Sequence, residues 1–340
     1  MGEHSAVSSS SSGAAAAAWE DTSAAAGVAA TAATEREQRR QTVTSQHLSA
    51  ALGAALSACS INPTSSRSNP LSFPGPSPRR SPQGLTSLNI SDCPLITNRG
   101  LQAFLRSPPI ASSLASLDIS CCCLISSPGL NLPHSLTALR HLSASHLPLL
   151  ESLTLLLPRT CPLEEISFSC CPVLQKLTVH SRSLCSLNLA GCRKLSSLSL
   201  ICPALSSLIL SQCSSLETFS PADRCLALKS INAFLCRSLP ASTLMTLLTH
   251  AKDLEEVNCG GCALLESVRL PPVTHGRVRR VMLEGCPVLC SVVVPAASLL
   301  LLDCRGCSRL REASVSGCAL LPRETQRVLK SLTKLARGTA

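Results

Sequence analysis

Cysteine is the residue type in this chain whose number and spacing could do chemistry. There are 21 cysteines in 340 residues. Two pairs, Cys259–Cys262 and Cys304–Cys307, have the Cys-x-x-Cys spacing of zinc ligands or of a dithiol redox centre. Elsewhere the cysteines recur regularly, as at Cys192, Cys202 and Cys213. Disulfides, a metal site and the internal packing of a repeat would each explain such spacing in a different class of protein.

A repeated template decides between these explanations. The pattern apolar-x-x-apolar-x-apolar-x-x-Cys fits ten times between Leu85 and Cys318. We call its last position the cysteine ladder. The ladder residues are Cys93, Cys122, Cys171, Cys192, Cys213, Cys236, Cys262, Cys286, Cys307 and Cys318. The L-x-x-L-x-L step is the strand signature of leucine-rich repeats, in which no repeat can bury its apolar face alone and neighbours stack into a solenoid.

The same register explains the two Cys-x-x-Cys pairs. Cys259 and Cys304 stand at the third apolar position of the template, where other coils have Leu189 and Leu210. The second cysteine of each pair is a ladder residue. We therefore interpret these thiols as structural and predict no metal and no cofactor, because a buried cysteine packs as a small apolar residue.

The coils are short and rich in strands. Second strand-like segments at residues 174–179, 195–200, 265–270 and 289–294 predict a return strand in several coils of ~21 residues. Residues 96–107 and 239–254 have the spacing of helix faces. Residues 136–145, between Cys122 and Cys171, are interpreted as a degenerate unit. The predicted fold is an α/β repeat, a leucine-rich-repeat solenoid with few helices.

Composition divides the chain into three segments. Residues 1–84 are low-complexity sequence rich in Ser, Ala and Pro, which predicts disorder. Residues 85–321 form the predicted solenoid. Residues 322–340 are a predicted basic amphipathic helix that caps it. The absence of a secretory pattern in residues 1–30 predicts a cytoplasmic or nuclear protein, with an organelle transit peptide as the alternative, and no apolar run is long enough to span a membrane.

The sequence SLNISDCPLITNRGLQAFL, from Ser87 to Leu105, resembles the cysteine-containing leucine-rich repeat. The shorter coils that follow are similar to those of plant-type F-box/LRR proteins. The resemblance covers the repeats only, since residues 1–84 contain no F-box pattern. It implies a substrate receptor of an SCF-type ubiquitin ligase, with a Skp-type adaptor, a cullin and an unidentified protein substrate as partners.

Other function classes have less support in the sequence. The chain contains no P-loop, nucleophile elbow, zincin or dinucleotide-binding motif, so we do not expect an enzyme. A stand-alone scaffold without a ubiquitin link is the first alternative. A nucleic-acid-binding solenoid is the second, because the net charge is +10, although one Trp, five Phe and no Tyr leave few rings to stack on bases.

The outward residues of the predicted main strands are the candidate binding residues. They lie between the two apolar residues of each L-x-L step, and we expect them to line a concave polar face. These residues are Asn89, Asp118, Ser167, Asn188, Ile209, Asn232, Asn258, Met282 and Asp303. Charge changes at Asn188, Asn232 and Asn258 are expected to weaken binding of a protein partner without unfolding the chain.

Overall fold

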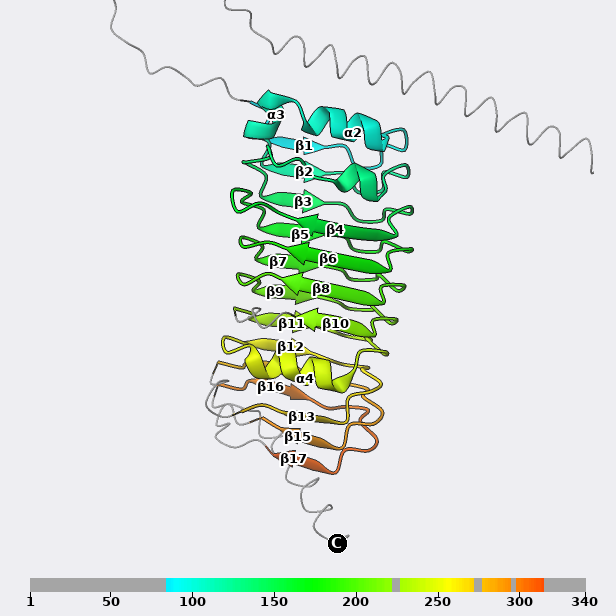
Figure 1. Ribbon diagram of the computed structural model, residues 1–340. Helices are drawn as coiled ribbons and strands as arrows, with labels where there is room; N and C mark the ends of the chain where they lie inside the picture. The colour runs from blue at the N-terminus through cyan, green and yellow to red at the C-terminus, as the bar shows by residue number, and fades with distance from the viewer. Residues whose placement is uncertain (1–83, 222–226, 272–276, 295–297, 315–340) are drawn as a thin grey trace, which may run out of the picture. The chain divides into compact units, whose positions relative to one another are not determined.

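The chain folds into a stack of coils, each of which contributes one strand to a long parallel sheet and one return element (Figure 1). The computed structural model describes residues 84–221, 227–271, 277–294 and 298–314. The predictions made for residues 1–83, for Cys318 and for the helix at 322–340 lie outside the described residues.

In the described part of the chain, the main sheet has ten strands that follow one another in coil order. They are β1 (Ser87–Asn89), β2 (Ser116–Asp118), β3 (His141–Ser143), β5 (Glu165–Ser167), β7 (Ser186–Asn188), β9 (Ser207–Ile209), β11 (Ser230–Asn232), β12 (Glu256–Asn258), β14 (Arg280–Met282) and β16 (Leu301–Asp303). All neighbours pair in parallel and in one register, so that the central residue of each strand lies beside the central residue of the next. A coil averages about 24 residues.

The return elements form a second series that runs against the main strands (Figure 1). In coil order they are α2 (Asn98–Leu105), η1 (Ser127–Leu130), β4 (Ser152–Leu156), β6 (Lys176–His180), β8 (Ser197–Ile201), β10 (Thr218–Pro221), α4 (Ala241–His250), β13 (Ser267–Arg269), β15 (Ser291–Val293) and β17 (Glu312–Ser314). A further helix, α3 (Pro108–Ser113), belongs to the first coil. The return strands pair as one group of four and one group of three, and α4 lies between the groups in coil order.

The core lies between the two series and is built from the apolar template positions. Leu187 and Leu189 of the main strand and Leu200 of the return strand in the same coil are all 0% exposed. Their alternation with polar residues places them on one face of each strand, as the period of a β-strand requires. The prediction of a strand-rich solenoid with few helices is confirmed, and so are the four expected return strands, which are β6, β8, β13 and β15.

Residues 136–145, expected to be a degenerate unit, belong to one coil of the stack. The main strand β3 pairs with β2 and β5, and Leu139, Leu142 and Ala144 fill the three apolar positions. Leu147 stands at the ladder position and is fully buried. The segment departs from the template, as the interpretation of a degenerate unit expected, in that a leucine replaces the ladder cysteine.

The last match to the template belongs to the return series. Its strand, β17, pairs with β15 and not with the main strand β16. The spacing explains the error, because Cys318 follows Cys307 by only 11 residues, about half a coil. Of this last match, the described residue Ala313 therefore lies in the return series and not in a main strand as the sequence analysis expected.

Every described coil turns at a residue with a left-handed backbone, directly before the ladder position. These residues are Asp92, Cys121, His146, Cys170, Gly191, Gln212, Leu235, Gly261, Gly285 and Gly306. Their φ angles lie between 55° and 76°. Glycine adopts this conformation without cost, whereas most other residues are strained in it. The next residue closes a turn, as where the Cys213 N–H donates to the Leu210 carbonyl at 3.0 Å.

Candidate binding face and cysteine ladder

The nine predicted binding residues lie in one continuous column on the outer face of the main sheet. Each is the last residue of its strand, and neighbours in the column are register partners. Ser143 of β3, which the sequence analysis did not name, fills the place between Asp118 and Ser167. Asn89 is exposed and the others are half-buried. The structure thus brings these side chains together, and their role in binding stays a prediction.

Six of the nine also have a local structural role. In each case the side-chain Oδ1 accepts a hydrogen bond from the backbone N–H two residues later, at 2.8 to 3.1 Å. The six are Asn89, Asp118, Asn188, Asn232, Asn258 and Asp303. The N–H groups directly after these residues pair with the next coil, as where the Leu189 N–H donates to the Ile209 carbonyl at 2.8 Å. Asn and Asp make this local turn readily, and it satisfies the donor that the strand pairing does not use.

A second outward column begins each main strand and was missed by the sequence analysis. It comprises Ser87, Ser116, His141, Glu165, Ser186, Ser207, Ser230, Glu256, Arg280 and Leu301. The repeat template could have predicted this column. Residues two apart in a strand face the same side, so the residue before the central leucine points outward like the residue after it. The binding face therefore has at least two columns of side chains on each coil.

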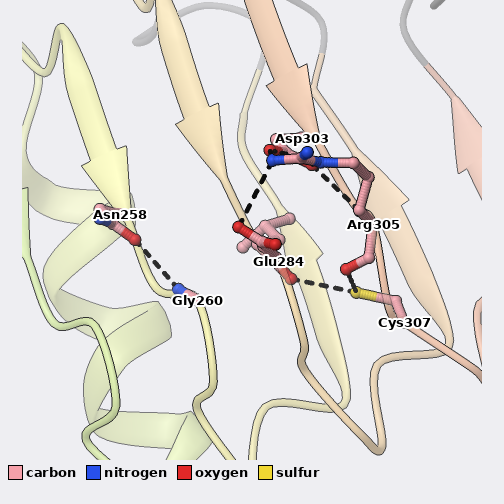
Figure 2. Close-up of polar contacts among 7 residues, drawn as sticks. Asn258, Gly260, Glu284, Asp303, Arg305 and Cys307 are labelled. Carbon is pink, nitrogen blue, oxygen red and sulfur yellow. Dashed lines mark hydrogen bonds and ion pairs between the residues drawn. The ribbon is translucent and has the colours of Figure 1, made fainter.

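Charge pairs lie on this face at β3 and β5, and again from β12 to the turn that follows β16. The Nδ1 of His141 and the Oε2 of Glu165 are 3.0 Å apart, and Arg280 donates to Glu256 at 2.8 Å. Arg305 donates to Asp303 at 2.7 Å and reaches Glu284 at 3.5 Å (Figure 2). These hydrogen bonds from Arg305 lower the pKa of Asp303. The hydrogen-bonding atoms that these side chains leave unused can contact charged groups of a partner.

A cluster of serine hydroxyl groups occupies the face near β3 and β5. The hydroxyls of Ser120 and Ser143 are 2.9 Å apart, and those of Ser145 and Ser167 are 3.0 Å apart. Ser169 donates to the Ser145 hydroxyl at 2.9 Å. These groups satisfy one another, which makes this part of the face polar but uncharged.

Apolar side chains are present farther along the same face. Ile209 and Met282 are half-buried, as is Phe234, and Leu301 is 40% exposed. A Cβ at Gly260 would lie only 3.0 Å from Cδ2 of the Phe234 ring and 3.0 Å from the Glu284 carbonyl oxygen. Phe234 therefore packs against the backbone of the next coil at a point where only glycine leaves it room.

The ladder cysteines connect neighbouring coils. Each donates its thiol hydrogen to the carbonyl of the third apolar residue in the preceding coil, at 3.0 to 3.5 Å. The donors are Cys122, Cys171, Cys192, Cys213, Cys236, Cys262, Cys286 and Cys307. Cys93 belongs to the first described coil and is only partly buried. Cys202 makes the equivalent bond in the return series, to the Val179 carbonyl at 3.6 Å.

Burial keeps several of these thiols protonated. It raises the pKa of Cys122 to about 11 and the pKa values of Cys213 and Cys286 to about 12. A protonated thiol can donate a hydrogen bond but is a poor nucleophile and metal ligand. In the described residues, no group of three or more His, Cys, Asp or Glu side chains is arranged to hold a metal ion.

The Cys-x-x-Cys pairs follow the repeat. Cys259 is fully buried at the third apolar position, and its carbonyl accepts the thiol of Cys286 in the next coil. Cys307 donates to the carbonyl of Leu283 in the preceding coil. Each pair thus occupies the positions that leucine and a ladder cysteine take in other coils.

Comparisons with known proteins found one family model and several solved structures. A family model described as Leucine Rich repeat matches residues 83–105. The leucine-rich repeat domain of the type III effector XopL is 21% identical, with a TM-score of 0.45 over 66% of this chain and 77% of that chain. A leucine-rich repeat protein from Bacteroides ovatus is 17% identical, with a TM-score of 0.16 over 59% of this chain and 73% of that one.

A leucine-rich repeat protein of Leptospira interrogans is 14% identical, with a TM-score of 0.17 over 73% of this chain and 93% of the other. No curated protein matches the chain. Among the helices of the described residues, none has the length and apolar character needed to cross a membrane. The parallel coils and their leucine positions form a leucine-rich-repeat solenoid, and the family model matches the first of these repeats at residues 83–105; this fold suggests protein–protein interaction.

Proposed function

We propose that this chain is a non-catalytic module that recognises a protein partner across the outer face of the main sheet. The observation that carries the proposal is the unbroken double column of outward side chains over ten described strands. Solenoids use such extended faces for binding. The core lies on the other side of the sheet, so these side chains can change without loss of packing.

The face has the mixed character of a protein interface. Half-buried Ile209 and Phe234 lie between the His141–Glu165 and Arg280–Glu256 pairs, and half-buried Met282 lies on the same strand as Arg280. In protein complexes a few apolar or aromatic side chains supply most of the affinity, and a polar rim excludes water around them. We therefore place the centre of the interface on β9, β11 and β14.

A pair of variants with the same added charge tests this assignment. Ile209→Glu/Met282→Glu adds two negative charges to the main face, and Leu156→Glu/Ser220→Glu adds two at exposed positions of the return strands β4 and β10. Proteins captured by the full chain should be lost with the first variant and retained with the second. Circular dichroism checks that both remain folded. Equal capture by the two variants would refute the proposed face.

The asparagine column permits a second test that leaves the fold intact. Substitution of Asn188, Asn232 and Asn258 by Asp retains the Oδ1 acceptor that each backbone N–H needs and adds three negative charges. Binding of the captured partner should weaken, whereas the corresponding alanine variant should lose stability as well. The aspartate variant thus separates recognition from local structure.

We propose further that the partner is a substrate of an SCF-type ubiquitin ligase and that a Skp-type adaptor and a cullin are also bound. The resemblance of residues 87–105 and of the later short coils to F-box/LRR proteins supports this role. Affinity purification of the full chain, followed by mass spectrometry, should enrich Skp and cullin subunits. If neither is enriched when substrate-like partners are captured, a stand-alone scaffold is the better description.

A cytoplasmic or nuclear location is part of the proposal. All the described cysteines are free thiols, which persist in reducing compartments. A fluorescent fusion of the full chain should appear in one of these compartments, and import into an organelle would contradict the proposal.

A further inference from the structure

A hollow with two arginines lies at the turns that follow the main strands β7, β9 and β11. Its volume is about 370 Å³, and it is lined by Arg193, Gln212, Ser214, Leu235 and Arg237. We call it the turn pocket. Its residues come from three successive coils, because β9 pairs with both β7 and β11.

The turn pocket is positively charged without compensation. The three turns, residues 190–194, 211–215 and 234–238, contain Arg193, Lys194 and Arg237 but no Asp or Glu. Within the described residues, the guanidinium of Arg237 has no hydrogen-bond or ion-pair partner, and Arg193 only reaches the Gln212 amide oxygen at 3.5 Å. In contrast, Arg140, which directly precedes β3, and Arg280 of β14 each pair with a glutamate. The cations of the turn pocket are thus available to an anion.

The spacing of the two arginines suits a single compact anion. Their coils are two strand steps apart, about 10 Å at the backbone. Side chains of this length can converge on one group from both sides, and a guanidinium binds phosphate oxygens through two parallel N–H donors. The Ser214 hydroxyl and the Gln212 amide lie between them and add neutral donors.

The charge is confined to these coils. The residue after the ladder cysteine is Arg193, Ser214 or Arg237 here, but Pro172 in the coil before and Ala263 in the coil after. A polyanion such as nucleic acid would need a longer track of cations. The pocket also adjoins the carboxyl ends of β9 and β11, two of the strands on which we place the centre of the protein interface.

We propose that the turn pocket binds the phosphate group of a phosphorylated serine or threonine in the protein partner. This inference rests on the proposed recognition function and specifies the chemical class of the partner. A segment lying across β7, β9 and β11 would present its phosphorylated side chain to Arg193 and Arg237, while its neighbours contact the outer columns.

The test uses the full chain and two degenerate peptide pools that differ only in a central phosphoserine or serine. In fluorescence anisotropy at physiological salt, the phosphorylated pool should bind at least about tenfold more tightly, as expected when charged donors contact a phosphate. Arg193→Gln/Arg237→Gln should abolish the difference. Arg309→Gln/Arg311→Gln, which removes two exposed positive charges elsewhere, should retain it.

The inference would be overturned by equal binding of the two pools, by a preference that survives in Arg193→Gln/Arg237→Gln, or by tighter binding of a single-stranded DNA oligonucleotide than of the phosphorylated pool. If inorganic phosphate displaces the phosphorylated pool at a concentration similar to that of the peptides, the pocket binds free anions and the inference is also overturned. If the captured partner binds Arg193→Gln/Arg237→Gln normally but not Ile209→Glu/Met282→Glu, the pocket assignment fails and the proposed function stands.

Discussion

The left-handed turn residue of each coil can be tested with one methyl group. Gly285 has a φ of +69°, and a Cβ built there meets no atom within 4 Å. Gly285→Ala therefore changes only the backbone preference, with no clash and no lost contact. A left-handed backbone costs a non-glycine residue about 1–2 kcal/mol. Alanine recovers about 0.4–1 kcal/mol through the lower entropy of the unfolded chain, so we expect a net loss of about 1 kcal/mol.

Gly100→Ala is the matched control, because the same methyl group is added where the backbone is helical. Gly100 lies in the first turn of α2, and its Cβ would contact the Thr97 hydroxyl at an ordinary 3.6 Å. Alanine is favoured over glycine in a helix by up to about 1 kcal/mol, so this variant should gain stability. The measurement is urea denaturation of the full chain followed by far-ultraviolet circular dichroism.

The two variants should shift the midpoint of unfolding in opposite directions. If the same variants are unfolded by heat, a loss of 1 kcal/mol corresponds to a decrease in Tm of about 2–4 °C for a domain of this size. If Gly285→Ala is as stable as the unmodified chain, or if both variants change in the same direction, the backbone of the turn is not the reason for glycine at that position.

Three further predictions concern the buried side chains. Cys213→Ala should lower the free energy of unfolding by about 1–2 kcal/mol, because it removes a buried sulfur and leaves the Leu189 carbonyl without its thiol donor. Urea denaturation measures this loss, and an unchanged midpoint would show that the thiol does not stabilise the fold. Burial raises the pKa of Cys213 from 9.0 to about 12. The unfolded chain therefore loses this proton first, and stability should be fully present below pH ~9 and fall as the pH rises toward ~12, which denaturation midpoints at pH 8 and 10.5 would check. Gly260→Ala should displace the Phe234 ring and cost about 1–3 kcal/mol, measured by thermal unfolding, and a variant as stable as the unmodified chain would show that the ring moves freely.

Most of the fold could be predicted because leucine positions determine strand register. The three apolar residues of each template identify a strand, its buried face and its place in the stack, as at Leu184, Leu187 and Leu189, which are all fully buried. The errors arose where cysteine was taken as the marker. Leu147 fills the ladder position equally well, because burial and size matter there more than the thiol.

The roles of the binding residues were harder to predict from the sequence. An asparagine such as Asn232 is consistent with a solvated contact residue and with a local cap, and only the 3.1 Å bond from the Phe234 N–H reveals the second role. The left-handed turns at Leu235 and Gln212 could not be predicted, because these residues are not glycine and nothing in the sequence marks their backbone conformation. The turn pocket joins residues of three coils, and single-coil patterns do not show such a site.

The stack also determines how the protein would yield under tension. The hydrogen bonds of the main sheet run along the axis of the stack, so a pulling force applied to the two ends loads each interface between coils in series. Each coil contacts chiefly its neighbours, and the coils should detach one after another. Every detached coil of about 24 residues releases about 80 Å of chain. Under load this solenoid would act as an extensible spring whose length increases in steps, and the end coils would yield before the middle ones.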